Sequence, residues 1–163
     1  MALAGVGVDI VEIARMERIL ERTPSFARRV FTDEERGYCE GTARPAAHYA
    51  CRFAAREAVL KALGIGFSEG VSWDDVSVSS DATGRPLAVL KGRAREVADR
   101  RGVLAVAISL SFTHDMAVAN AVATTAQTAP KQQEPRDPRR ELANSFREAR
   151  SVIDELERVQ DGK

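Results

Sequence analysis

Residues 45–63 constrain the fold of this chain more than any other segment, because they carry the pattern of a long helix. Pro45 pre-sets the backbone of the first turn, and Gly64 can take the left-handed conformation that ends a helix. One side of this helix is expected to be buried, and it carries Ala46, Tyr49, Ala50, Phe53, Ala54, Glu57, Leu60 and Lys61. The predicted buried side therefore includes a carboxylate and an ammonium group.

The carboxylate of Glu57 needs a functional explanation. An unpaired carboxylate on a buried helix face would cost several kcal/mol, so Glu57 requires a cation, a metal ion or a proton. Lys61 lies one turn later on the same face and offers either a simple ion pair with Glu57 or a contact to a bound phosphate. We favour the phosphate contact, because simple pairing leaves a second carboxylate, Asp9, unexplained.

Asp9 lies in the first predicted strand. The alternation of residues 5–10 places Val6, Val8 and Ile10 on one face of that strand, and Asp9 on the other face beside two glycines. The glycines leave a strip without side chains, so a ligand or a second element can approach the backbone closely. Taken alone, Asp9 is more simply interpreted as an exposed carboxylate at a strand end.

The strand and the helix together resemble the holo-acyl-carrier-protein synthase family, the small bacterial 4′-phosphopantetheinyl transferases. Members open with a Gly-(Ile/Val)-Asp strand and carry (Arg)-Phe-x-x-(Lys)-Glu-Ala-x-x-Lys-Ala-x-Gly, which corresponds here to residues 52–64. The resemblance extends over residues 3–124. Three further pieces keep the family's order and spacing, namely Phe31-Thr32, Gly84-Arg85-Pro86 and Ser109-Leu110-Ser111.

The resemblance implies a reaction in which a serine of an apo acyl carrier protein attacks the β-phosphorus of coenzyme A, and 3′,5′-ADP leaves. It implies that Asp9 and Glu57 hold Mg²⁺ and that Lys61 acts with them in catalysis. Two carboxylates with phosphate oxygens and waters form an all-oxygen site suited to Mg²⁺, and phosphoryl transfer needs mainly positioning and charge neutralisation. The residues implied to bind coenzyme A are Arg52, Lys61, Gly84, Arg85, Pro86 and Ser111.

The chain departs from the family pattern at three positions. Many members have a histidine two residues before Ser109 and another just after Ser111, where this chain has Ala107 and Phe112. The effect of these two residues on coenzyme A binding is left open by the sequence. Arg56 replaces the usual lysine before the glutamate, which keeps the charge and changes the donor geometry. We expect Arg56 to lie off the buried face, where a solvated arginine is the simpler interpretation.

A first helix is predicted over residues 12–21, with Arg15, Arg18 and Arg22 at three- and four-residue spacing on one face. Acyl carrier proteins are acidic, and the family resemblance implies that they dock on this arginine face. The alternative is an ordinary solvated face, because three glutamates lie nearby. We favour docking.

The remaining pattern predicts an α+β fold with a mainly antiparallel sheet packed against the long helix, as in 4′-phosphopantetheinyl transferases. The other expected elements are a capped helix from Thr32 to about Glu40, a hairpin of strands around 76–78 and 86–90, a helix over 92–101, and two final strands over about 103–111 and 116–123. The turn between those last strands holds His114, which we expect to be solvated.

Composition argues against several classes of protein. The net charge is zero, so no overall field attracts nucleic acid or an anionic membrane. The sequence shows neither a run of about twenty apolar residues nor a secretory signal, so we expect a cytoplasmic protein without membrane segments. Cys39 and Cys51 lack metal-binding or redox spacing and are expected to be buried thiols.

The composition changes near residue 124, where threonine, glutamine and three prolines begin. We predict a transferase domain at residues 1–124, a Pro-containing linker at 125–138 and a helical C-terminal extension at 139–163 with a two-heptad apolar seam. Family members end near residue 124 and form homotrimers with active sites between subunits. The extension is therefore additional, and its role is not given by the sequence.

Two other functions compete with the transferase. One is a non-catalytic module that binds carrier proteins, and the other is a Mg²⁺-dependent nucleotide hydrolase. The presence of Asp9, Glu57 and Lys61 argues against the first, and the hydrolase would need a water-activating base that we do not find in the sequence. Whether the carrier protein serves fatty-acid or polyketide synthesis is left open, as is the identity of the general base.

Overall fold

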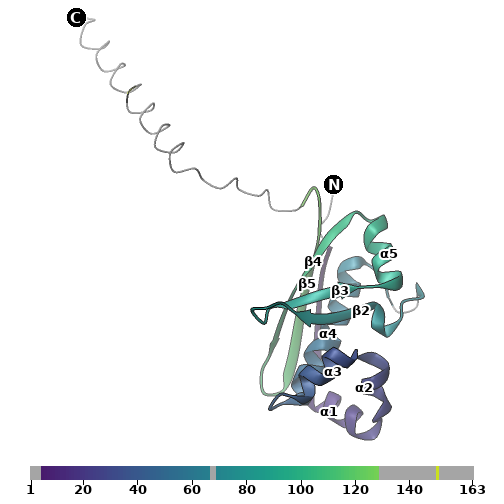
Figure 1. The fold of residues 1–163 in the computed structure, drawn as a ribbon, viewed down its shortest axis with the longest axis vertical. Coiled ribbons are helices and arrows are strands. Elements are labelled where there is room, and N and C mark those ends of the chain that lie inside the picture. The colour runs from purple at the N-terminus through teal and green to yellow at the C-terminus, as the bar shows by residue number, and fades with distance from the viewer. Residues whose placement is uncertain (1–4, 67–68, 129–149, 151–163) are drawn as a thin grey trace, which may run out of the picture. The chain divides into compact units, whose positions relative to one another are not determined.

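The computed structural model describes residues 5–66, 69–128 and 150, and the elements below are drawn in Figure 1. In chain order they are β1 (Gly5–Glu12), α1 (Ile13–Arg22), α2 (Ser25–Val30), α3 (Asp33–Glu40), α4 (Pro45–Leu63), the 3₁₀ turn η2 (Trp73–Asp75), β2 (Val76–Ser80), β3 (Pro86–Leu90), α5 (Gly92–Arg100), β4 (Val103–Phe112) and β5 (Met116–Thr125). This is the predicted α+β arrangement.

The strands form two antiparallel sheets. One has three strands in the order β1-β5-β4, and the other is the β2-β3 hairpin. The pairing of β1 with β5 runs from Gly5 opposite Ala123 to Glu12 opposite Met116. Helix α4 runs along the larger sheet, with α1, α2 and α3 near one end of it and α5 near the other (Figure 1). The predicted antiparallel sheet against a long helix is confirmed.

The backbones of β1 and α4 are in unusually close contact. A Cβ atom added at Gly5 would lie 1.9 Å from the carbonyl oxygen of Ala62, and one added at Gly7 would lie 1.9 Å from that of Ala58. The predicted glycine strip is therefore filled by α4, and a side chain at either position would force the two elements apart. This contact fixes the position of Asp9 on β1 relative to the helix.

The opposite face of β1 is apolar and exposed in the single chain. Val6, Val8 and Ile10 share that face as predicted, and their exposed fractions are 65%, 46% and 58%. Contiguous large apolar side chains on an exposed sheet face mark interaction sites, so this face of β1 is a candidate contact surface.

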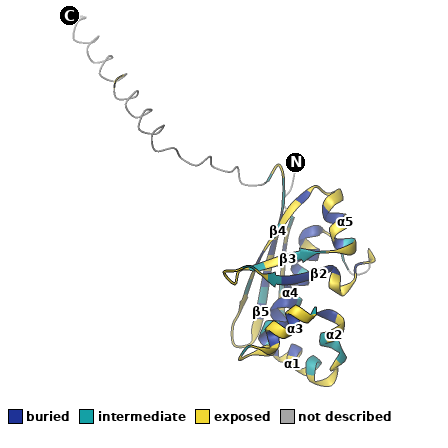
Figure 2. Cartoon of the chain, viewed as in Figure 1, coloured by how far each residue is buried: buried dark blue, intermediate teal, exposed yellow. Residues whose placement is uncertain are grey.

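The buried residues form two clusters, and α4 belongs to both. The C-terminal half of α4 packs with β2, β4, β5 and α5, whereas its N-terminal half packs with α1, α2 and α3. Figure 2 shows α4 buried along most of its length. Because α4 is enclosed on most sides, a one-sided apolar stripe describes it poorly.

Local signals account for the ends of several helices. Helix α4 begins at Pro45 and ends before Gly64, whose φ is 62°, as predicted. The hydroxyl of Thr32 and the carboxylate of Glu35 form the predicted capping box at the start of α3. Sequence reasoning missed α2 and η2, which have only six and three residues, and α2 has no side-chain cap.

The chain divides into two compact units, residues 1–129 and 130–163. Apart from residues 125–128 and 150, the predicted linker at 125–138 and the predicted helical extension at 139–163 lie outside the described residues. Among the helices that the structure describes, none has the length and apolar character needed to cross a membrane.

Candidate active site

Asp9 of β1 and Glu57 of α4 line the same cleft, which has a volume of about 630 Å³. The side chain of Asp9 is 18% exposed, and Glu57 is half-buried. The close packing of β1 on α4 brings the two carboxylates together although they are far apart in the sequence. The predicted carboxylate pair is therefore present in one cleft.

Lys61 contacts Asp9 and does not form the simple ion pair with Glu57 that its spacing allows. Its Nζ donates to Asp9 Oδ1 at 2.8 Å and to the carbonyl oxygen of Val8 at 3.0 Å. Burial raises the pKa of Glu57, the nearby charge of Asp9 raises it further, and Lys61 acts in the opposite direction. Glu57 is thus the carboxylate of the pair whose charge is least compensated.

This imbalance predicts a measurable change in stability. Because the pKa of Glu57 is raised on folding, its contribution favours folding at acid pH and is lost as pH rises through the folded-state pKa. Glu57→Gln is therefore expected to raise the Tm of the metal-free protein at pH 7 by about 1–3 °C, with no gain below the ordinary glutamate pKa of about 4.3. The check is thermal unfolding in EDTA at several pH values, with exposed Glu17→Gln as the control. A lower Tm at pH 7 for Glu57→Gln alone would contradict this origin of the shift.

The aromatic side chains of Phe26, Phe53 and Trp73 also line the cleft, and Phe53 lies on α4 one turn before Glu57. The rings of Phe53 and Trp73 are 5.6 Å apart, and those of Phe26 and Phe53 are 6.2 Å apart. Arg15 of α1 lines the same cleft. The exposed arginine face of α1 therefore continues into the cleft that holds the carboxylates.

Arg15, Arg18 and Arg22 are all exposed on α1, as predicted, while Ile13 and Met16 are buried. The helix runs from residue 13 to residue 22, within one residue of the predicted start and end. The arginines are thus available on the surface, and their part in carrier docking stays a prediction.

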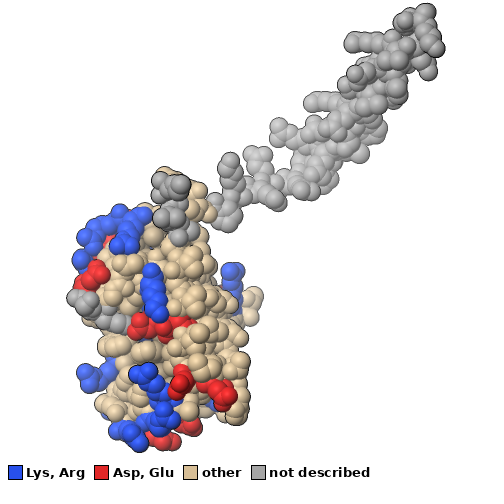
Figure 3. Space-filling view, turned by 180° about the vertical axis from the view of Figure 1, so that it is seen from behind, with Lys and Arg blue, Asp and Glu red and all other residues tan. Residues whose placement is uncertain are grey.

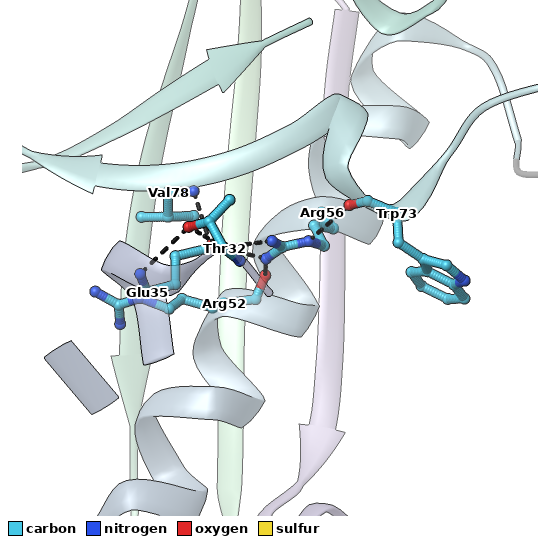
Figure 4. Close-up of polar contacts among 6 residues, drawn as sticks. All are labelled: Thr32, Glu35, Arg52, Arg56, Trp73 and Val78. Atoms are coloured by element: carbon cyan, nitrogen blue, oxygen red, sulfur yellow. Dashed lines mark hydrogen bonds and ion pairs between the residues drawn. The ribbon is translucent and has the colours of Figure 1, made fainter. Parts of the chain in front are cut away.

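The prediction for Arg56 was wrong, because the residue is completely buried, and its guanidinium points to Glu35 and to the backbone of Trp73 (Figure 4). Arg56 forms two parallel hydrogen bonds to the carboxylate of Glu35 on α3, at 2.9 Å and 2.5 Å, and Glu35 is itself 1% exposed. Its Nε also donates to the carbonyl oxygen of Trp73 at 3.1 Å. The side of α4 assigned to solvent is instead packed against α3 and β2.

Two backbone groups complete the environment of Glu35. The amide of Val78 donates to Oε1 and the amide of Thr32 to Oε2, each at 2.9 Å. Burial raises the pKa of Glu35, but the hydrogen bonds and charge of Arg56 outweigh it and hold that pKa below its ordinary value. The network ties α3, β2 and η2 to the middle of α4, one residue before Glu57.

A second, smaller pocket of about 180 Å³ contains Arg52, Gly84 and Pro86. The guanidinium of Arg52 lies over the Tyr38 ring at 3.9 Å, and Arg52 is 4% exposed. Within the described part of the chain, its Nε has no hydrogen-bond partner. A buried cationic donor without a partner is suited to an anion.

The other residues implied to bind coenzyme A are more dispersed. Arg85 is exposed, and its backbone amide donates to Asp81 Oδ1 in the β2-β3 turn. Ser111 is exposed on β4, and its carbonyl oxygen accepts from the Cys51 thiol, which lines the small pocket. Lys61 contacts Asp9 but does not itself line the larger cleft; it lines a separate pocket beside the start of β1. The two pockets share no lining residue.

Sequence reasoning missed His48, which also lines the small pocket. Its ring packs edge-on against Tyr38 and Phe112, with centroids 5.4 Å and 5.3 Å away. Burial lowers the pKa of His48, and the charges of Arg52 and Arg44 lower it further. The available signal was the four-residue spacing of His48 and Arg52, which places both on one face of α4.

Cys39 and Cys51 are free and buried, as predicted. Burial raises the pKa of Cys39 to about 12 and that of Cys51 to about 11, so neither is an activated thiolate. The side chain of His114 is 90% exposed, as expected for a turn residue. None of these three residues lines the cleft that holds Asp9 and Glu57.

Comparison with known proteins places the chain in one family. The model of the 4′-phosphopantetheinyl transferase superfamily matches residues 5–126, and the chain belongs to that superfamily. The holo-[acyl-carrier-protein] synthase of Moorella thermoacetica is 47% identical over 116 residues, which cover 71% of this chain and 90% of the relative. The synthase of Syntrophus aciditrophicus is 44% identical over 114 residues, covering 69% of this chain and 89% of that protein. Within the superfamily, the chain is thus a holo-acyl-carrier-protein synthase type of enzyme.

Solved structures agree with this assignment. The Neisseria meningitidis holo-[acyl-carrier-protein] synthase superposes with a TM-score of 0.67 at 33% identity, over 74% of this chain and 98% of that one. The Helicobacter pylori synthase, solved in complex with coenzyme A, gives a TM-score of 0.63 at 29% identity, over 73% of this chain and 99% of that one.

Proposed function

We propose that the chain transfers 4′-phosphopantetheine from coenzyme A to a serine of an apo acyl carrier protein. The serine oxygen forms a bond to the β-phosphorus, the bond from that phosphorus to the bridging oxygen breaks, and 3′,5′-ADP leaves. Family membership supports this reaction, and coenzyme A bound in the Helicobacter pylori relative supports the donor. The observation that carries the site is that Asp9 and Glu57 line one cleft, while Lys61 contacts Asp9.

The donor groups at the cleft fit Mg²⁺. Lys61 already places a cation between Asp9 Oδ1 and the Val8 carbonyl oxygen, so this corner of the molecule favours positive charge. Asp9 and Glu57 would hold the metal through hard carboxylate oxygens, with waters and phosphate oxygens as further ligands. When bound, Mg²⁺ would neutralise the diphosphate and stabilise charge developing on the leaving oxygen.

Arg52 and its neighbours are proposed to bind the nucleotide end of coenzyme A. The buried guanidinium of Arg52 supports contact with a phosphate, because its Nε lacks a partner within the described residues. Gly84 and Pro86 line the same pocket, and Arg85 lies in the turn between β2 and β3. Ser111 adjoins the pocket, because its carbonyl oxygen accepts a hydrogen bond from the pocket residue Cys51. The aromatic rings of the pocket offer apolar surface to a base.

We further propose a homotrimer with active sites between subunits. A single chain leaves the apolar face of β1 exposed, and the view from behind shows a broad surface without charged side chains (Figure 3). The Arg52 pocket and the Asp9–Glu57 cleft share no lining residue. In the proposed trimer, the Arg52 pocket of one subunit completes the Asp9–Glu57 cleft of its neighbour. Analytical ultracentrifugation of wild type and Val8→Glu tests this: the variant is expected to dissociate, and a monomeric wild type would contradict it.

Carrier docking on α1 predicts a selective change in kinetics. Reversing the charge of Arg15 and Arg22 to glutamate is expected to raise KM for the carrier protein at least tenfold, with a change of about twofold or less for coenzyme A. Steady-state assays at low ionic strength measure both constants, because screening weakens such contacts in salt. Lys91→Glu with Arg100→Glu, on the α5 region, is the matched control. An equal rise in KM for the carrier protein in both double variants would argue against docking on α1.

The domain boundaries and location complete the proposal. All residues proposed for chemistry fall within residues 1–124, so this segment is proposed as the transferase domain, with 125–138 as linker and 139–163 as a helical extension. The cytoplasm is the proposed location, and the free thiols of Cys39 and Cys51 suit its reducing conditions.

The nucleotide product tests the transferase against the two competing functions. The full-length protein is incubated with coenzyme A and Mg²⁺, with and without apo carrier protein, and 3′,5′-ADP is measured by chromatography. The transferase releases 3′,5′-ADP only when the carrier is present. Release without carrier would indicate a hydrolase, and no release by a protein that binds the carrier would indicate a non-catalytic module.

A further inference from the structure

The ammonium group of Lys61 occupies oxygens that a metal ion would need. Its Nζ lies 2.8 Å from Asp9 Oδ1 and 3.0 Å from the carbonyl oxygen of Val8. Both are hard oxygen atoms of the kind that bind Mg²⁺. The lysine therefore supplies positive charge at Asp9.

The reach of Lys61 across to β1 follows from the packing of α4. The helix backbone at Ala58 and Ala62 lies directly against Gly7 and Gly5, so the stem of Lys61 starts beside the strand. Its side chain is 51% exposed, whereas that of Asp9 is 18% exposed. An ion pair with one half-exposed, flexible partner is weak and exchanges readily.

Resting on the proposed Mg²⁺ site, we propose that Lys61 is an internal competitor of the metal ion. A divalent cation can bind Asp9 Oδ1 only when the ammonium group leaves it, because two cations at one oxygen repel each other. The released Nζ can then contact a phosphate of coenzyme A. Metal binding and phosphate binding are thereby coupled through one side chain, and each is tighter when the other is present.

The alternative is an additive site, in which Lys61 contacts phosphate and has no effect on the affinity for the metal ion. In the additive case, removing the ammonium charge leaves metal affinity unchanged in the absence of nucleotide. In the competitive case, removing it strengthens metal binding. The direction of the change in metal affinity therefore separates the two.

The test uses Mn²⁺ as a spectroscopic probe, bound to the full-length protein and followed by electron paramagnetic resonance. Lys61→Met, which removes the charge and keeps an apolar stem, is expected to bind Mn²⁺ about fivefold more tightly than wild type without nucleotide. Added 3′,5′-ADP is expected to tighten Mn²⁺ binding in both proteins, because phosphate oxygens are proposed ligands of the metal, and to tighten it several-fold more in wild type, where it also draws Lys61 away from Asp9. Lys91→Met, a change of the same kind at an exposed lysine before α5, is expected to match wild type.

Each outcome supports or overturns the competition. Equal or weaker Mn²⁺ binding by Lys61→Met overturns it while leaving the proposed metal site intact. Absence of Mn²⁺ binding in both proteins overturns the metal site itself, and the competition with it. Binding by Lys61→Met alone supports strong competition, provided that Asp9→Asn in the Lys61→Met background abolishes that binding.

Discussion

Replacing Arg56 with methionine is expected to lower the free energy of unfolding by about 3–5 kcal/mol, the largest change in stability that we predict. The substitution leaves the carboxylate of Glu35 buried at 1% exposure without its cation. The two backbone amides that remain bonded to Glu35 cannot compensate its charge. Urea denaturation at pH 7 measures the loss.

The pH dependence identifies the origin of this loss. The pKa of Glu35 is lowered on folding, so its contribution to stability is present above the unfolded pKa and is lost as pH falls through the folded pKa. The stability gap between wild type and Arg56→Met should therefore narrow in acid. Arg36→Met removes a pair with Asp33, whose side chain is 97% exposed, and is expected to cost less than about 1 kcal/mol. Equal losses for the two variants, with no pH dependence, would contradict a buried-charge origin.

Asp9→Asn and Glu57→Gln are each expected to lower kcat for transfer by about a hundredfold or more, without changing the fold. Each substitution removes a carboxylate proposed to hold Mg²⁺ beside the reacting phosphates. Circular dichroism and titration with 3′,5′-ADP check folding and nucleotide binding, and Mn²⁺ affinity provides a second readout. Glu12→Gln changes an exposed carboxylate on the rim of the same cleft and is expected to stay within about twofold of wild type. Wild-type turnover by folded Glu57→Gln would remove Glu57 from the metal site.

The elements that the sequence predicted well depend on local chemistry. Pro45 and Gly64 act on the backbone of their own turns, and the capping box of Thr32 and Glu35 spans only four residues. The alternation in residues 5–10 likewise needs only the geometry of one strand. Such signals do not depend on which distant segment packs nearby, so they can be read before the fold is known.

The errors concern contacts between distant elements. Arg56 was assigned to solvent because a helical wheel assumes one buried side, whereas α4 is enclosed by the sheet on one side and by α3 and β2 on another. Its partner Glu35 is 21 residues away, and its capping role gave no sign of a second role. The contact of Lys61 with Asp9 also required the packing of β1 on α4, because the sequence offered Lys61 only a pair with Glu57 or a bound phosphate, and the phosphate contact was favoured.

In the candidate site, too, the residue types could be predicted from the sequence, whereas their arrangement in space could not. The family motif singled out Asp9, Glu57, Lys61 and Arg52 from residue type and spacing. Only the three-dimensional arrangement separates them into a carboxylate cleft and an arginine pocket. His48 was missed because the motif placed histidines at the positions of Ala107 and Phe112, and the structure brings a histidine to the same pocket from α4.

The mass of the carrier protein after reaction tests the proposed transfer most directly. Apo acyl carrier protein is incubated with the full-length chain, coenzyme A and Mg²⁺, and then weighed by mass spectrometry, with parallel reactions in EDTA and with Asp9→Asn. The proposed function predicts that the carrier gains the mass of one phosphopantetheine group on its serine with the wild-type protein, and no mass in EDTA or with Asp9→Asn. An unchanged carrier mass with folded wild-type protein that binds coenzyme A, or an equal gain with Asp9→Asn, would contradict it.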